Sequence, residues 1–247
     1  MAVITQTIGR ARYVVPSAFT AASAACAVMS MQSPYLPADP AWWILCSVLL
    51  DKLDGTAARL LHAETAIGVQ FDSIADLIAF GIAPAHLFYR LACAGPLVFP
   101  GSDLLWALIA VVYAAATAWR LHRFNREASG AQAHCFRGMP STLAGGLFAA
   151  YVVTFMPDGG TLDFAVLTLL MLILSMAMNL NYRSNKITIP KRRDFLVLQA
   201  SFVLFVYYAT FTRQYPPLVF LSSLVALAFS TWGARRDVHD ERSSPGV

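Results

Sequence analysis

The chain has 247 residues and a formal net charge of +4; 57% of its residues are hydrophobic and only 13% are charged. Soluble domains carry about 25% charged residues, so this composition excludes an ordinary soluble protein. Several apolar runs are long enough to cross a bilayer, where a helix satisfies its own backbone hydrogen bonds. We therefore expect an all-α, polytopic integral membrane protein.

Taken in chain order, the apolar runs predict about eight transmembrane helices. Their approximate ranges are 14–31, 41–61, 70–93, 104–119, 140–156, 162–180, 195–211 and 216–233. Pro84 falls inside the third range, and we expect it to kink that helix because proline has no backbone N–H. The last residues, 234–247, are polar and predict a C-terminal tail without a packed core.

The basic residues predict the orientation of these helices. With the N-terminus placed in the cytoplasm, all of the 18 lysines and arginines except Arg90 and Arg213 fall on the cytoplasmic side. Both termini are then expected in the cytoplasm, and the protein in the inner membrane. Because anionic lipid headgroups attract such charges, the basic excess does not indicate a nucleic-acid partner.

Four aspartates stand out in this apolar chain, at positions 51, 54, 72 and 76. Asp51 and Asp54 are three residues apart and Asp72 and Asp76 are four apart, so each pair lies on one face of its helix. Carboxylates in an apolar setting pair, bind metal or line a wet cavity. All-oxygen sites suit Mg²⁺ or Mn²⁺, and four carboxylates are enough for a two-ion site. The alternative interpretation is a set of solvated charges at helix ends.

Small residues lie between the two aspartate pairs. Gly55, Ala58 and Gly68 leave room for a ligand close to the backbone. Arg59 follows them, and its planar guanidinium suits phosphate or nucleotide recognition. A plain topology charge at the cytoplasmic membrane face is the competing interpretation of Arg59.

The stretch from Asp51 to Asp76 resembles the signature of the CDP-alcohol phosphotransferases. Every fixed position of that signature is filled at its spacing: Asp51, Asp54, Gly55, Ala58, Arg59, Gly68, Asp72 and Asp76. The family consists of integral membrane enzymes that move a phosphoalcohol from a CDP-linked donor to an acceptor hydroxyl and release CMP. The resemblance covers about residues 10–190, which we take as a catalytic membrane domain 1–190, followed by two additional helices at 191–233 and the tail at 234–247.

The resemblance implies a role for each matching residue. Asp51, Asp54 and Asp72 would hold two Mg²⁺ or Mn²⁺ ions, and Asp76 would reach a metal and act as the general base. The nucleotide-binding set would be Gly55, Ala58, Arg59, Gly68 and Thr20. Thr20 belongs to a Pro-Asn-x-x-Thr pattern of relatives, in which Ser17 stands here for the usual Asn.

Further stretches resemble the bacterial and archaeal phosphatidylserine synthases within this family. They are residues 71–85, 120–125, 136–141 and 182–186, with Met139 in place of the usual Leu and Ser141-Thr142 in place of the usual proline and its neighbour. This resemblance implies CDP-diacylglycerol and L-serine as substrates, phosphatidylserine and CMP as products, membrane lipids around the protein, and a homodimer. Candidates for the lipid phosphate or the serine carboxylate are Arg120, Arg123, Arg137, Arg183 and Lys186.

Two alternatives remain open from the sequence. The same chemistry could use another acceptor alcohol, such as glycerol 3-phosphate or an inositol phosphate. Intramembrane acids also serve ion-coupled transporters, although such proteins usually carry internal repeats, and no repeat is visible here.

Overall fold

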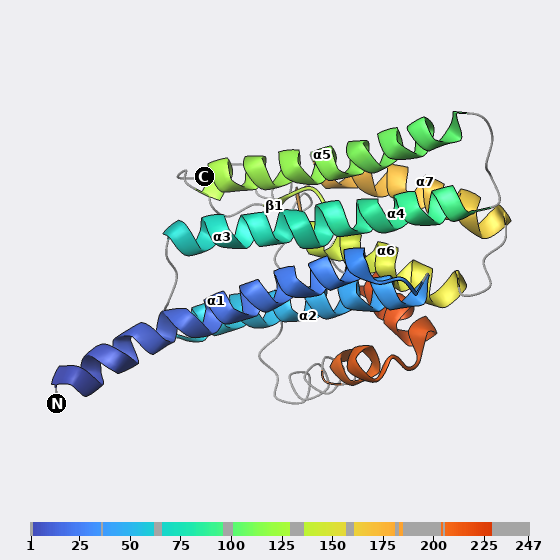
Figure 1. Cartoon of the computed structure of the whole chain (residues 1–247). Coiled ribbons are helices and arrows are strands. Elements are labelled where there is room, and N and C mark those ends of the chain that lie inside the picture. Colours follow the sequence, from blue (N-terminus) through green and yellow to red (C-terminus); the bar gives the residue numbers. More distant parts are fainter. Residues whose placement is uncertain are drawn as a thin grey trace, which may run out of the picture.

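A computed structural model of the chain shows a bundle of long helices (Figure 1). It describes residues 2–35, 37–61, 66–95, 101–128, 136–156, 161–180, 183–184, 204 and 206–228. The helices are α1 (Ala2–Gln32), α2 (Ala38–Leu60), α3 (Ala66–Asp76), α4 (Ala83–Ala94), α5 (Ser102–Ala128), α6 (Ser141–Phe155) and α7 (Thr161–Asn179). A π-helical segment, η1 (Leu77–Ile82), joins α3 to α4 without a break. Residues 206–212 and 216–228 are also helical.

Figure 1 shows the helices in layers. The pair α1 and α2 forms one side, α5 and α7 form the other, and the α3–η1–α4 rod and α6 lie between them. The helical fold is thus confirmed, with one small exception. Two-residue strands β1 (Phe136–Arg137) and β2 (Arg183–Ser184) pair antiparallel, with Arg137 opposite Arg183.

Among the residues that the structure describes, three helices are long and apolar enough to cross a membrane, judged by length and composition. They are Val14–Gln32, Gly68–Ala94 and Ser102–Arg126; Ser141–Phe155, Asp163–Asn179 and Pro216–Ala228 are apolar but shorter. α2 carries Asp51, Lys52 and Asp54, which lower its hydropathy. The count of eight spans and their orientation therefore stay predictions. Most of the predicted seventh span, 195–211, and the end of the eighth lie outside the described residues.

α6 is the central helix of the bundle. Almost all its side chains are buried, which is the behaviour expected of a helix that is apolar all round. Gly145 lets the η1 segment approach closely, because a Cβ there would lie 3.1 Å from Phe80 Cδ1 and 3.3 Å from its Cα. The core of the bundle therefore packs directly against the rod that carries Asp72 and Asp76.

The η1 segment explains how the rod passes Pro84. Because Pro84 has no N–H to donate to the carbonyl of Phe80, an uninterrupted α-helix would lose a bond there. The chain instead adopts the wider π-helical turn over 77–82, and Pro84 sits in the first turn of α4. The predicted disturbance thus takes the form of a π-helical segment directly after Asp76.

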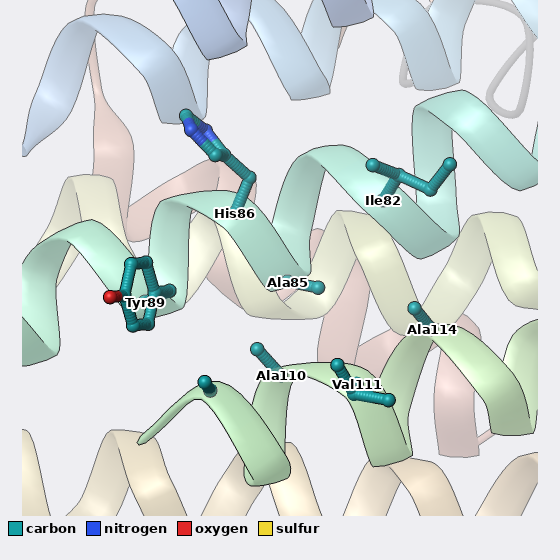
Figure 2. Close-up of a pocket in the computed structure, with 8 residues that line it drawn as sticks. Ile82, Ala85, His86, Tyr89, Ala110, Val111 and Ala114 are labelled. Carbon is teal, nitrogen blue, oxygen red and sulfur yellow. The ribbon is translucent and has the colours of Figure 1, made fainter. Parts of the chain in front are cut away.

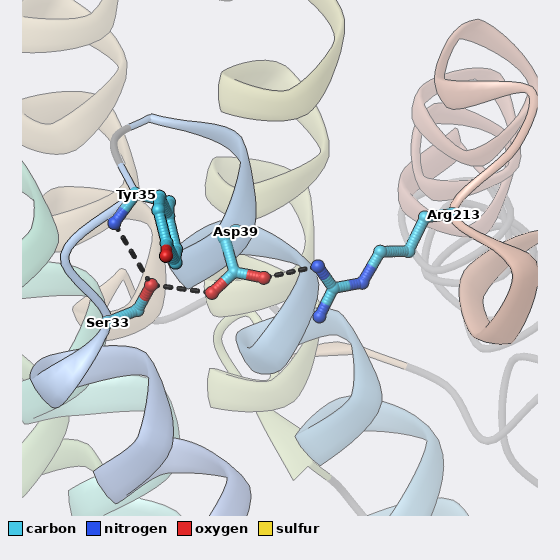
Figure 3. A network of polar contacts seen from close by, with 4 residues as sticks. All are labelled: Ser33, Tyr35, Asp39 and Arg213. Atoms are coloured by element: carbon cyan, nitrogen blue, oxygen red, sulfur yellow. Dashed lines mark hydrogen bonds and ion pairs between the residues drawn. The ribbon is translucent and has the colours of Figure 1, made fainter.

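A polar network fixes the end of the bundle opposite the aspartates (Figure 3). The Ser33 hydroxyl donates to Asp39 at 2.5 Å, and the Arg213 guanidinium pairs with the same carboxylate. Burial alone would raise the pKa of Asp39, but the hydrogen bonds from Ser33 and Arg213 and the charge of Arg213 outweigh it and lower that pKa. Arg90 donates to the carbonyl of Ser33 at 2.6 Å. The two arginines predicted on the non-cytoplasmic side thus both bind the Ser33 region.

A tight turn at Gly138 docks the segment before α6 onto the end of α7. Gly138 has φ +82°, and a Cβ there would lie 2.4 Å from the carbonyl oxygen of Met178. The Met139 N–H donates to the carbonyl of Ala177 at 3.2 Å. Glycine is therefore required at position 138 by both backbone conformation and space.

We expect Gly138→Ala to lower the free energy of unfolding by roughly 2–4 kcal/mol, from left-handed strain together with overpacking. Gly101→Ala is the matched control, since Gly101 has φ +84° but a Cβ there meets no described atom within 4 Å. Gly101→Ala should lower the free energy of unfolding by only about 1–2 kcal/mol, from left-handed strain alone. Denaturant unfolding of both variants in detergent measures the difference; equal losses would contradict the contact with Met178.

Candidate metal and active site

Two adjacent helices bring the aspartates together. α2 carries Asp51 and Asp54 near its C-terminal end, and α3 carries Asp72 and Asp76 in its last two turns. Asp51, Asp72 and Asp76 each offer a carboxylate oxygen such that all three atoms lie within 4.8 Å of one another. The two predicted pairs therefore meet across the α2–α3 contact, and each helix contributes to the cluster.

The cluster fits a divalent cation. Carboxylate oxygens around one Mg²⁺ lie about 2.1 Å from it, hence up to about 4.2 Å from each other, and the observed spacing needs little adjustment to reach that. The carboxyl groups of Asp51 and Asp76 lie within hydrogen-bonding distance. Two carboxylates tolerate this proximity only with a proton or a cation between them. An all-oxygen donor set of this kind suits Mg²⁺ or Mn²⁺.

Asp54 lies beside the group of three. Its side chain is 6% exposed, and its Oδ2 atom has no hydrogen-bond partner among the described residues. Asp51 and Asp72 are close enough for their charges to act on it. A buried carboxylate oxygen without a partner is costly, so Asp54 supplies an independent reason to expect a cation here.

The predicted nucleotide-binding residues surround Asp54. The Thr20 hydroxyl, which donates to the carbonyl of Pro16 at 3.1 Å, also lies within hydrogen-bonding distance of Asp54. At Gly55 a Cβ would meet no described atom within 4 Å, so there is open space beside this backbone. Ala58 and Gly68 are half-buried. Arg59 is part of α2, and its side chain lies outside the described residues.

Of the predicted basic residues whose side chains the structure describes, Arg120 on α5 is the one at the carboxylates. Its guanidinium donates to the Ser141 hydroxyl at 2.8 Å, and its charge acts on both Asp51 and Asp76. Arg123 points elsewhere: it donates to the carbonyls of Asn179 at 3.4 Å and Met178 at 3.5 Å, at the end of α7.

The other basic candidates are only partly described. Strand pairing places the backbones of Arg137 and Arg183 opposite each other, and their side chains lie outside the described residues. Lys186 is wholly outside them.

Residues that motif reasoning did not single out also join this region. Asn125 donates to the Ser73 hydroxyl at 3.0 Å, linking α5 to the turn between Asp72 and Asp76. Tyr207 donates to the carbonyl of Leu49 at 2.8 Å, and the charge of Asp51 acts on its hydroxyl. Asn125 lies in one of the motif stretches and could have been found there, whereas the sequence around Tyr207 carries no such signal.

A separate apolar groove of about 260 Å³ lies between the rod and α5 (Figure 2). Its lining includes Ile82, Ala85, His86 and Tyr89 from the rod and Ala110 from α5. None of the four aspartates lines it. The groove is therefore separate from the carboxylate cluster.

Comparison with known protein families identifies the fold. A family model described as CDP-alcohol phosphatidyltransferase matches residues 13–181, which include the carboxylate cluster, Arg120 and the Gly138 turn. The chain belongs to this family. The resemblance found in the Asp51–Asp76 stretch is thereby confirmed, and divalent metal use by the family agrees with the cluster.

The chain is also similar in sequence to several bacterial and fungal proteins. One from Helicobacter pylori (strain ATCC 700392 / 26695) is 34% identical over 130 residues, 52% of each chain. One from Bacillus subtilis (strain 168) is 37% identical over 115 residues, 47% of this chain and 60% of the relative. One from Saccharomyces cerevisiae is 33% identical over 121 residues, 45% of this chain and 41% of the relative. All three are named CDP-diacylglycerol–serine O-phosphatidyltransferase, and the chain spans about half of their length.

We expect Mn²⁺ or Mg²⁺ to raise the thermal midpoint of the purified protein, because an ion bound only by the folded state stabilises it. The gain is about 2.7 kcal/mol at an ion concentration 100 times the dissociation constant. Asp72→Asn should lose most of this gain. Asp103→Asn is the matched control, because Asp103 lies in the first turn of α5, at the end of that helix away from the carboxylate cluster. This variant should keep the gain in thermal midpoint. An unchanged midpoint shift in Asp72→Asn would contradict the metal assignment.

Proposed function

We propose that this protein transfers the phosphatidyl group of CDP-diacylglycerol to the hydroxyl of L-serine, giving phosphatidylserine and CMP. The observation that carries the proposal is the meeting of Asp51, Asp72 and Asp76 beside the buried Asp54, with an arginine at their edge. Family membership supports a CDP-linked donor, and the names of the similar proteins support serine as the acceptor.

Asp51, Asp54 and Asp72 would hold two divalent ions, with Asp76 reaching one of them. When bound, the ions would neutralise the pyrophosphate of the donor and the charge that develops on the departing CMP. Asp76 is the proposed general base: it takes the proton of the serine hydroxyl as the serine oxygen bonds to the phosphatidyl phosphorus. The bond from that phosphorus to the oxygen of CMP breaks, and CMP leaves with the electron pair.

Arg120 is the proposed anion-binding residue of the acceptor side. Its hydrogen bond to Ser141 fixes the guanidinium near the carboxylates, which lowers the entropy lost when it binds a ligand. Serine brings a carboxylate that suits this group, and a lipid phosphate offers the same chemistry. Arg123 instead binds the carbonyls at the end of α7, so we assign it a positioning role.

The donor nucleotide is proposed to lie along the small residues of α2. Open space at Gly55 and the small side chain of Ala58 allow cytidine and phosphates to approach the backbone. Gly68, half-buried at the start of α3, would extend this surface, and Thr20 and Arg59 would contribute polar contacts. Thr20 lies within hydrogen-bonding distance of Asp54, which supports a role for it at the metal side of this surface.

We further propose an eight-helix protein of the inner membrane with both termini and the active site on the cytoplasmic side. Residues 1–190 would form the catalytic domain, with two additional helices over 191–233 and a polar tail beyond them. The proposed assembly is a homodimer surrounded by membrane lipids. The charge asymmetry of the chain and the location of all four aspartates at one end of the bundle support this orientation.

Purified protein with CDP-diacylglycerol and Mn²⁺ or Mg²⁺ is expected to release CMP only when L-serine is added. Chromatographic detection of CMP with a panel of acceptors measures this directly. CMP release that depends on glycerol 3-phosphate or an inositol phosphate, and not on serine, would assign a sister activity. Ion flux in proteoliposomes without CMP release would instead favour a transporter.

The variant Gly55→Ala tests whether the open space at Gly55 is used by the ligand, without destabilising the protein. Because its Cβ meets no described atom, and alanine favours a helix interior by up to about 1 kcal/mol, the variant should be as stable as the original protein or more so. We expect the KM for CDP-diacylglycerol to rise, by roughly 10-fold for each 1.4 kcal/mol of lost binding. Steady-state kinetics and thermal unfolding together test this. An unchanged KM would remove Gly55 from the nucleotide surface.

A further inference from the structure

The outward face of α5 is hollowed near its C-terminal end. A hollow of about 420 Å³ is lined there by Trp119, His122, Arg123 and Arg126. His122 and Arg123 each lie three or four positions from both Trp119 and Arg126, so all four residues share one side of the helix. The rings of Trp119 and His122 lie 6.1 Å apart and form one wall. None of the described side chains in this lining is acidic.

This hollow is distinct from the carboxylate site. Arg120 faces the aspartates and Ser141, whereas His122 lies about 160° from Arg120 around the helix. Asn125 points toward Ser73 on α3. The hollow therefore opens on the side of α5 that faces away from the bundle, which in a membrane is the lipid side.

The hollow lies at the membrane–water boundary. The Asn125–Ser73 bond places this end of α5 at the depth of Asp72, near the end of the helical span Ser102–Arg126. Trp119 is 62% exposed, and tryptophan is enriched at the headgroup level of membrane proteins. The guanidinium groups of Arg123 and Arg126 lie one to two turns farther along, where a headgroup phosphate would be.

An apolar strip continues from the hollow toward the other end of α5. Leu104, Leu108 and Val112 lie on the same side of the helix as Trp119 and Arg126, and they are 68%, 54% and 51% exposed. The face thus changes from apolar through aromatic to cationic along its length. A phospholipid has the same order, from acyl chains through glycerol to phosphate.

We propose that this face binds an anionic membrane phospholipid, with its phosphodiester in the hollow and its acyl chains along the strip from Leu104 to Val112. Arg126 and His122 supply hydrogen-bond donors to the phosphate, and Arg123 adds positive charge while it stays anchored to the end of α7. The cationic lining disfavours zwitterionic lipids whose headgroup carries a quaternary ammonium. The proposal concerns a lipid that is not consumed, so it does not depend on the acceptor used in catalysis.

Native mass spectrometry of the full chain in detergent tests the proposal, without CDP-diacylglycerol or serine present. Phosphatidylglycerol and phosphatidylcholine are titrated separately, and bound lipids are counted. We expect tight binding of phosphatidylglycerol that weakens by at least ~10-fold in the double variant Arg126→Gln/His122→Gln, since both charge-assisted hydrogen-bond donors to the phosphate are lost. Phosphatidylcholine binding should be weaker and unchanged by the variant.

The control variant is Arg242→Gln, which removes one positive charge from the polar C-terminal segment and should leave phosphatidylglycerol binding unchanged. Equal phosphatidylglycerol binding by the original protein and the double variant would overturn the proposal. Displacement of the lipid by millimolar inorganic phosphate would also overturn it, because the site would then recognise the free anion. Both outcomes are independent of CMP release, so failure here is distinguishable from failure of the proposed enzymatic function.

Discussion

The central constraint on this structure is that an apolar helical bundle must hold several carboxylates close together. Asp51, Asp72 and Asp76 place carboxylate oxygens within 4.8 Å of one another, and Asp54 is buried beside them. Such a cluster destabilises the fold unless a proton or a cation lies between the carboxylates. The surrounding elements hold the charges together: α6 packs against the rod at Gly145 and Phe80, and the π-helical segment follows Asp76 directly. We therefore regard the bundle as a scaffold that keeps two helix ends in contact.

The basic residues near this cluster have divided tasks. Arg120 faces the carboxylates and is fixed by Ser141, while Arg123 three residues later binds the end of α7. Arg126 lines the hollow on the outward side of α5 with Trp119 and His122. Helix α5 thus carries three arginines at intervals of three residues. The first faces the carboxylates, the second binds the end of α7, and the third lies on the outward surface of the helix. Helical periodicity produces this division, because residues three apart differ by about 60° in direction.

Much of the site could be predicted from the sequence because its residues are local. The spacings of Asp51 to Asp54 and of Asp72 to Asp76 fix each pair on one helix face, and the short link between the helices lets the pairs meet. Other contacts at the site join segments that are distant in the sequence, so no local sequence pattern predicts them. They are Arg120 with Ser141, Asn125 with Ser73, and Tyr207 with Leu49. The β1–β2 pairing is not predictable from the sequence for a second reason, since two-residue strands leave no periodic signal. The π-helical segment was expected only as a kink at Pro84, because the sequence does not say how a helix relieves its missing bond.

The most direct test of this account is an anomalous-difference map from crystals of the protein grown with Mn²⁺. We predict peaks in contact with the carboxylates of Asp51, Asp72 and Asp76, with Asp54 contributing to the same centre. A map with full-strength Mn²⁺ peaks elsewhere and none at these carboxylates would contradict the claim that a divalent ion holds the two helix ends together.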